Sequence, residues 1–438
     1  MRQETSTTGF RSNNVSYSNF KSQEFVMNKS TFSPAVKQAI STFLIFSVIF
    51  LLLIFRNPRL FVYPEPWAED MTIFLGQEYN IGFPEDTFTL YSGYVHLLPR
   101  IISWIAMKFG MSGAMIVMTW TVLLFKLLTF YLIYKSKEIT SGYIKFALLA
   151  YLVLQPFIDE IYNNVTNLQW WLIYLMAILL IRRETSMSGF IFSAFMLLLS
   201  GLTGVNSVIF AVPCAYLLFK VRTKESLIKN SIVIACAFVQ FYFLYTSGRS
   251  GTGGIVYEGD ISEIINFFVS RAVTHSMFKC DTGIYMSLLI FPLFISAVAL
   301  NLWHYRKNTA VIFILLFGTA FTAVVMYNFL KTYPDLNFLI TGFGAERYFV
   351  LLRVYTFILL VSSIGIITKS LLSSRNYKRV MAFSCYLLCL VLMRNYSADY
   401  SQFGYQYYDD VAKFESAKSG DTIKFHVPPN WSLELTKK

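Results

Sequence analysis

Long apolar runs recur along most of this chain, and they constrain its fold more than any other feature. Runs of about 15–22 residues are typical of helices that cross a lipid bilayer. Only 14% of the residues are charged and 55% are hydrophobic, whereas soluble proteins have roughly 25% charged residues. We therefore predict an all-α polytopic membrane protein with about eleven transmembrane helices. The expected spans are 38–55, 113–134, 143–157, 164–181, 188–202, 205–219, 228–246, 283–303, 309–327, 348–368 and 380–393.

The charges of the connecting loops predict how these helices are oriented. Loops rich in Lys and Arg face the cytoplasm, and the short basic loops here are 135–142, 182–187, 220–229, 304–308 and 369–379. We therefore expect a cytoplasmic N-terminus and an external C-terminus. Residues 1–36 are polar and rich in Ser and Asn. We expect them to form a disordered cytoplasmic tail, with no cleavable signal peptide, before a membrane domain at 37–393.

The acidic loop, residues 64–100, is the most unusual segment of the chain. It lies within the first external loop, 56–112, and we expect it to carry the active surface. Ionised groups beside a bilayer must be solvated or paired, so a protein that only spanned the membrane would gain nothing from them. The loop holds six carboxylates, which are Glu65, Glu69, Asp70, Glu78, Glu85 and Asp86.

Two amphipathic helices are expected within the acidic loop. The first follows Pro66 and has Glu69 and Asp70 in its first turn, where carboxylates also stabilise a helix without any catalytic role. The second contains His96 and Arg100 on one face, four residues apart, with Pro99 between them as an expected kink. Arg100 needs an anion, which Glu69, Asp70 or a lipid phosphate would supply.

Several function classes are disfavoured by the composition. The five cysteines and four histidines show no disulfide framework and no metal-ligand spacing, so we expect neither a metal nor a cofactor. The net charge of +12 would suggest nucleic acid in a soluble protein. Here the cytoplasmic loops account for it, and no nucleic-acid partner is expected.

The C-terminal segment, residues 394–438, is expected to fold as a small external cap. Its residues alternate like a strand through KSGDTIKFHV and break at Pro428-Pro429, just before Trp431. This pattern is too regular for a frayed end.

Six motifs together give the chain a family resemblance. They are WAED (67–70), SGYVHLLPR (92–100), VTNLQWW (165–171), GLTGVNSV (201–208), ERYFVLL (346–352) and VPPNWSLEL (427–435). In this order, on the outer face or near outer span ends, they resemble the bacterial serotype-converting glucosyltransferases. Those enzymes have the GT-C fold, which they share with protein mannosyltransferases and the lipid A aminoarabinose transferase.

The resemblance implies a function. Such an enzyme sits in the bacterial inner membrane and takes a sugar, commonly glucose, from undecaprenyl phosphate. It passes the sugar with inversion to a hydroxyl of O-antigen, or lipopolysaccharide, on the periplasmic face. A separate synthase and flippase supply the donor. Glu69 and Asp70 are then the catalytic carboxylates, one acting as general base and the other pairing with His96, Arg100 or backbone.

Further roles follow from the same resemblance. Arg347, beside Tyr348 and oriented by Glu346, is the expected phosphate ligand, followed by Arg353 and then Arg100; the plain alternative for Arg347 is an interfacial anchor. Four residues at the outer end of the fourth span are expected to bind sugar, with an aromatic belt as their alternative: Asn167, Gln169, Trp170 and Trp171. Trp431 is expected to cap the acceptor, with packing as its alternative.

Two other functions are compatible with a polytopic chain. A flippase for lipid-linked sugar would place ionisable residues along a path within its spans, where only Arg353 is clearly so placed. A membrane O-acyltransferase would need an activated His near the cytoplasm, for which His304 beside Arg306 is a poor match.

The topology can be tested by labelling single cysteines in intact cells. In a background without native cysteines, an impermeant thiol reagent should label Gly420→Cys and leave Glu184→Cys unlabelled, because the tail is expected outside and loop 182–187 inside. Labelling of Glu184→Cys, or protection of Gly420→Cys, would remove the basis for an external active site.

Overall fold

The computed structural model describes residues 33–248, 255–278, 281–341, 345–394, 396 and 406–438. The chain divides into two units, Met1–Ile45 and Phe46–Lys438. In the first unit, the described residues begin helix α1 (Pro34–Arg56). The expected disordered tail lies almost wholly outside the described residues. All further contacts described below are within the second unit.

Seven helices of the described chain are long and apolar enough to cross a membrane, which makes this an integral membrane protein. They coincide with seven of the predicted spans. These helices are α1, α5 (Gly110–Lys135), α10 (Lys224–Thr246), α12 (Ile284–His304), α13 (Thr309–Thr332), α15 (Val350–Leu371) with the turn before it, and α16 (Ser374–Met393).

Four shorter apolar helices coincide with the remaining predicted spans. They are α6 (Gly142–Leu154), α7 (Leu168–Ile181), α8 (Met187–Gly201) and α9 (Asn206–Lys220). At 1.5 Å per residue, helices of 13–15 residues rise only about 20–22 Å, less than the roughly 30 Å of a bilayer's hydrocarbon core. Nearly every residue of α7 is buried, as expected for a helix that is apolar all round.

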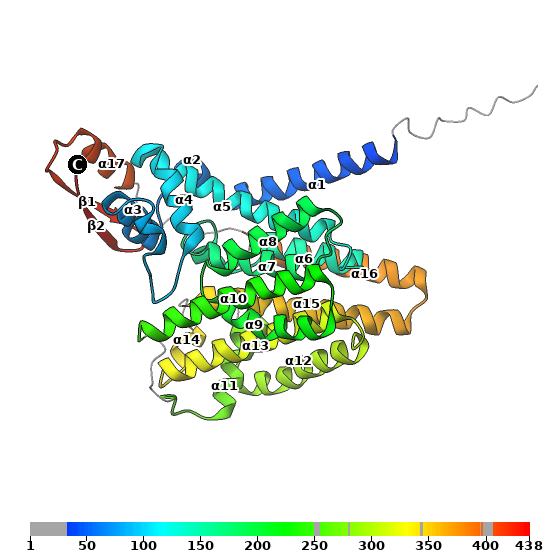
Figure 1. Ribbon diagram of the computed structural model, residues 1–438. Helices are drawn as coiled ribbons and strands as arrows, with labels where there is room; N and C mark the ends of the chain where they lie inside the picture. Colours follow the sequence, from blue (N-terminus) through cyan, green and yellow to red (C-terminus); the bar gives the residue numbers. More distant parts are fainter. Residues whose placement is uncertain (1–32, 249–254, 279–280, 342–344, 395, 397–405) are drawn as a thin grey trace, which may run out of the picture. The chain divides into compact units, whose positions relative to one another are not determined.

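The acidic loop folds into short helical pieces at one end of the bundle (Figure 1). After α2 (Pro58–Val62) come a π-helical turn, Asp70–Leu75, then α3 (Gly76–Asn80), a 3₁₀ turn, Glu85–Phe88, and α4 (Leu97–Met107). The predicted kink is absent, because Pro99 lies in the first turn of α4, where its missing N–H costs no helical hydrogen bond.

Arg100 holds the acidic loop together through a buried ion pair. Its Nη1 lies 2.6 Å from Asp86 Oδ1, and both side chains are almost fully buried. Its Nη2 donates to the carbonyl of Thr89 over 3.0 Å. The anion of Arg100 is therefore Asp86, from the same loop, and not Glu69, Asp70 or a lipid phosphate as the sequence suggested.

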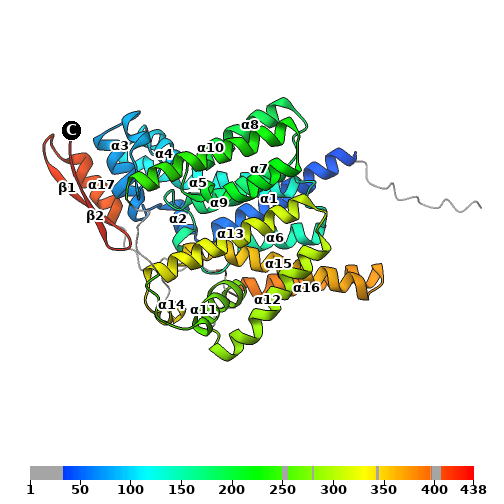
Figure 2. The same cartoon turned by 60° about the horizontal axis from the view of Figure 1, so that its bottom comes forward.

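The C-terminal residues form a helix and a hairpin that pack on the acidic loop. Helix α17 (Gln406–Ser416) precedes the antiparallel strands β1 (Thr422–Val427) and β2 (Trp431–Thr436). The hairpin lies beside α3 in both views (Figures 1 and 2). The amide of Ala68 donates to the carbonyl of Pro428 over 2.7 Å, so the cap directly holds the start of the turn that carries Glu69 and Asp70.

Candidate functional site

The connection between α6 and α7, residues 155–167, is the centre of the candidate site. It is not α-helical, yet it is buried along nearly its whole length. Asn163 Nδ2 donates to the carbonyl of Thr119 over 3.0 Å. Since Thr119 lies nine residues after the start of α5, the connection reaches about 14 Å along that helix. The shortness of α6 and α7 is thus explained, because their connection enters the bundle.

Asp70 joins the acidic loop to this connection. Its Oδ1 accepts hydrogen bonds from the amide and the hydroxyl of Thr166, over 2.8 and 2.6 Å. Its Oδ2 accepts one from the amide of Trp67 over 3.4 Å. Burial raises the pKa of Asp70 to about 6; the Thr166 and Trp67 donors lower it in part, and the charge of Glu69 raises it further.

Glu69 points elsewhere, as expected for adjacent residues about 100° apart around a helix. Its Oε1 accepts a hydrogen bond from the hydroxyl of Tyr91 over 3.1 Å. Its Oε2 is buried and has no hydrogen-bond partner among the described residues. A buried acceptor without a partner is uncommon in folded proteins. Glu69 therefore has an oxygen available for a donor that the protein does not supply.

Arg347 and Glu160 form the opposite side of the site. Arg347 Nη1 lies 2.9 Å from Glu160 Oε1, with 32% of the Arg347 side chain exposed. The backbone amide of Arg347 donates to Glu160 Oε2 over 3.3 Å. Burial raises the pKa of Glu160; Arg347 lowers it, and the charges of Glu346 and Glu69 raise it further. The connection that carries Glu160 also carries Thr166, which binds Asp70, the neighbour of Glu69. Arg347 and the turn of Glu69 therefore contact the same short segment.

The sugar-binding residues predicted at the start of α7 lie around this region, and all of them are buried. The ring of Trp170 is 5.5 Å from that of Tyr348, and its Nε1 donates to Asn167 Oδ1 over 3.2 Å. The Gln169 carbonyl accepts from Asn206 Nδ2 over 3.2 Å. With only 8% of Trp170 exposed, its position is not that of a lipid-facing aromatic belt.

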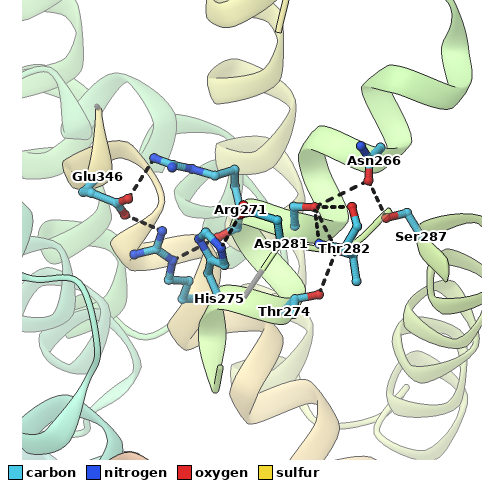
Figure 3. Close-up of polar contacts among 10 residues, drawn as sticks. Asn266, Arg271, Thr274, His275, Asp281, Thr282, Ser287 and Glu346 are labelled. Carbon is cyan, nitrogen blue, oxygen red and sulfur yellow. Dashed lines mark hydrogen bonds and ion pairs between the residues drawn. The ribbon is translucent and has the colours of Figure 1, made fainter. Parts of the chain in front are cut away.

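Arg353 belongs to a second, buried network. Figure 3 shows Glu346 and Arg271, two other members of this network. Arg353 pairs with Glu346 and its Nε donates to the carbonyl of Arg271 over 2.9 Å. Arg271 Nη2 lies 3.0 Å from Glu346 Oε1. Glu346 thus binds these two arginines, while Glu160 holds Arg347, so the expectation that Glu346 orients Arg347 is wrong.

His96 is buried just before α4. Its ring lies 5.6 Å from that of Tyr91, whose hydroxyl donates to Glu69, so His96 packs against a partner of Glu69. Two other predicted residues have different surroundings. Arg100 is paired with Asp86. Trp431, at the start of β2, is 43% exposed.

Three residues of the site were not predicted from the sequence: Glu160, Thr166 and Tyr91. One signal could have found Glu160: an acidic pair, Asp159-Glu160, stands between two apolar runs that are short for spans. Thr166 and Tyr91 carry no comparable signal, because their importance depends on contacts distant in sequence.

An apolar cavity of about 210 Å³ lies between α6, α7, α13 and α15. Leu351 lines it at the start of α15, four residues after Arg347. The lining continues to Ser362, about 16 Å along the helix, and includes residues 138–141, Tyr305 and Asn308 in loops at the opposite end of these helices.

Compared with known proteins, the chain matches no family model and no curated sequence. Within the described part of the chain, no group of three or more His, Cys, Asp or Glu side chains is placed to hold a metal ion.

The raised pKa of Asp70 should appear in the stability of the protein. Between an unfolded pKa near 3.8 and the folded value of about 6, the folded state keeps a proton that the unfolded chain has lost. The free energy of unfolding should therefore fall by about 3 kcal/mol in total as the pH rises from about 3 to 7.

This is measured by chemical unfolding in detergent at several pH values. Asp70→Asn should remove this component of the pH dependence, whereas Glu85→Gln, at an exposed carboxylate of the same loop, should keep it. An identical pH profile for Asp70→Asn and the unmodified protein would contradict the assignment.

Proposed function

We propose that this protein is a membrane glycosyltransferase of the GT-C type. It transfers a sugar, glucose by resemblance, from undecaprenyl phosphate to a hydroxyl of an O-antigen or lipopolysaccharide acceptor. The observation that carries the proposal is that the α6–α7 connection contacts both the turn of Glu69, which has an unpartnered carboxylate oxygen, and the partly exposed Arg347. A general base and a fixed cation are the two groups that this transfer needs.

Glu69 is proposed as the base. The acceptor oxygen attacks the anomeric carbon of the donor sugar while its proton passes to Glu69 Oε2. The bond between that carbon and the phosphate oxygen breaks, and polyprenyl phosphate leaves with the electron pair. Asp70 is proposed as a positioning residue, since Thr166 and Trp67 already occupy both of its oxygens.

Arg347 is proposed to bind the donor phosphate. A guanidinium offers a planar fork of donors that matches phosphate geometry. Glu160 fixes this fork from one side, and the exposed part of the side chain remains within reach of a ligand. Arg353 is a weaker candidate, because its side chain is fully buried and paired with Glu346.

The apolar cavity along α15 is proposed to take the polyprenyl chain. Its lining is mainly aliphatic and aromatic and runs from Leu351, four residues after Arg347, to residues 138–141, Tyr305 and Asn308 in the loops proposed to be cytoplasmic. A chain attached to a phosphate at Arg347 would enter at the Leu351 end and extend toward the cytoplasmic face. Burial of hydrocarbon there gives roughly 25 cal/mol per Å².

The membrane arrangement is part of the same proposal. Eleven crossings, with the four short helices supported by their neighbours, leave the acidic loop and the C-terminal cap on the periplasmic face of the inner membrane. The donor then depends on a separate synthase and flippase. No cofactor enters this proposal.

A flippase is the second candidate, because ionisable residues are buried inside helices. Arg353 is one, and Lys126 is another, with its Nζ between the rings of Tyr162 and Trp171 at 4.2 and 4.5 Å. Both are enclosed by other side chains, and neither lines the apolar cavity along α15. This arrangement favours a structural role over a transport path.

The function is tested by mass spectrometry of surface polysaccharide from cells with and without the protein, where one added hexose per repeat is expected. Glu69→Gln should then reduce transfer roughly 10²–10⁴-fold, because the amide cannot accept the proton. Glu85→Gln should transfer normally, and membrane levels of both variants should match. Near-normal transfer by Glu69→Gln would mean that Glu69 is only a helix-start residue.

The role of Arg347 is tested separately by Arg347→Lys and Arg347→Ala. A phosphate ligand needs the fork of donors, so both variants should lose transfer, with Ala the worse. An interfacial anchor needs only a long cationic side chain, which Lys supplies. Transfer is measured in membranes at varied donor concentration. Full activity of Arg347→Lys would exclude the proposed contact.

A further inference from the structure

A small polar cleft lies where the start of the acidic loop meets the α6–α7 connection. Its volume of about 50 Å³ leaves space for about four water-sized groups. It is therefore suited to a few hydroxyl groups along one edge of a ligand, and too small to enclose a whole lipid headgroup. The residues that form its walls include Arg59, Tyr63, Glu65, Trp67, Asn163 and Asn164.

Two residues that line the cleft, Asn163 and Glu65, carry buried oxygen atoms without partners among the described residues. Asn163 is 3% exposed; Thr119 holds its Nδ2, and its Oδ1 has no partner. Glu65 is similar, because its Oε2 lies 3.7 Å from Arg59 Nη2 while its Oε1 has no partner. Such fixed acceptors favour a ligand with several O–H donors.

The other walls fit a carbohydrate better than an anion. Tyr63, 57% exposed, and Trp67 add aromatic surface on which the C–H face of a pyranose can pack. A phosphate in the cleft would be attracted by Arg59 but repelled by the carboxylate of Glu65. An uncharged hydroxyl-rich group would not be repelled.

The cleft lies next to the turn that carries Glu69 and Asp70. Trp67 lines the cleft, and its amide donates to Asp70. Asn163 and Asn164 line it from the other side, two to three residues before Thr166, which also binds Asp70. A ligand in the cleft is thus held next to the segment that carries Glu69.

We propose that this cleft is an acceptor subsite, which binds one sugar unit of the acceptor polysaccharide through its hydroxyl groups. This inference rests on the proposed glycosyltransferase function. The donor phosphate and chain, by contrast, are assigned to Arg347 and the α15 cavity. Acceptor and donor affinity should therefore respond to different residues.

The test uses the full-length protein in membranes, with undecaprenyl-phosphate glucose as donor and O-antigen polysaccharide from cells lacking this protein as acceptor. Glu65→Ala and Tyr63→Ala should each raise the acceptor KM about five- to tenfold, as expected for one lost hydrogen bond or stacking contact. The donor KM should change less than twofold. A folding defect would reduce the maximal rate and would not produce this separation.

Two matched controls lie in the same loop outside the cleft. Glu85→Ala removes an exposed carboxylate, and Phe88→Ala removes an aromatic side chain that is 69% exposed; neither should alter the acceptor KM. An unchanged acceptor KM in both cleft variants, with donor still consumed, would overturn the acceptor subsite alone. If the unmodified protein neither transfers nor hydrolyses the donor sugar, the proposed function itself fails and the subsite with it.

Discussion

The hydrogen bonds between Asp70 and Thr166 are the interaction on which the rest of the site depends. Non-helical backbone inside an apolar bundle is stable only where protein groups satisfy its polar atoms. The α6–α7 connection meets this demand through several long-range contacts, including Gln155 Nε2 to the carbonyl of Val350 over 2.8 Å and Tyr162 to the carbonyl of Leu53. Asp70 adds the link to the acidic loop, so the loop and the connection hold each other in place.

The position of Arg347 depends on a second set of buried charges. Glu346 and Arg347 are adjacent in one 3₁₀ turn, yet they face different networks. Glu346 lies between Arg271 and Arg353, and removing one partner from such a buried group typically costs 3–5 kcal/mol. These ion pairs fix the turn from its inner side and thereby hold Arg347 beside Glu160.

The sequence predicted the elements of this fold better than their contacts. Each of the eleven apolar segments coincides with a helix, because long apolar runs in a membrane protein have few alternatives to a helix. Arg100 was correctly expected to need an anion, but its partner Asp86 could not be chosen among six carboxylates of one loop. Glu160 and Thr166 escaped selection because each acts on a residue about 100 or more positions away. Such pairings are decided by packing, which periodicity does not encode.

The different roles proposed for Glu69 and Asp70 follow from the hydrogen bonds that each carboxylate would lose on protonation. Asp70 accepts three hydrogen bonds, two of them from Thr166, so taking up a substrate proton would disturb the contacts that join the loop to the bundle. Glu69 Oε2 has no such contact among the described residues. In the proposed reaction, a proton can therefore reach Glu69 without breaking a hydrogen bond, while Asp70 keeps the turn that carries both residues in place.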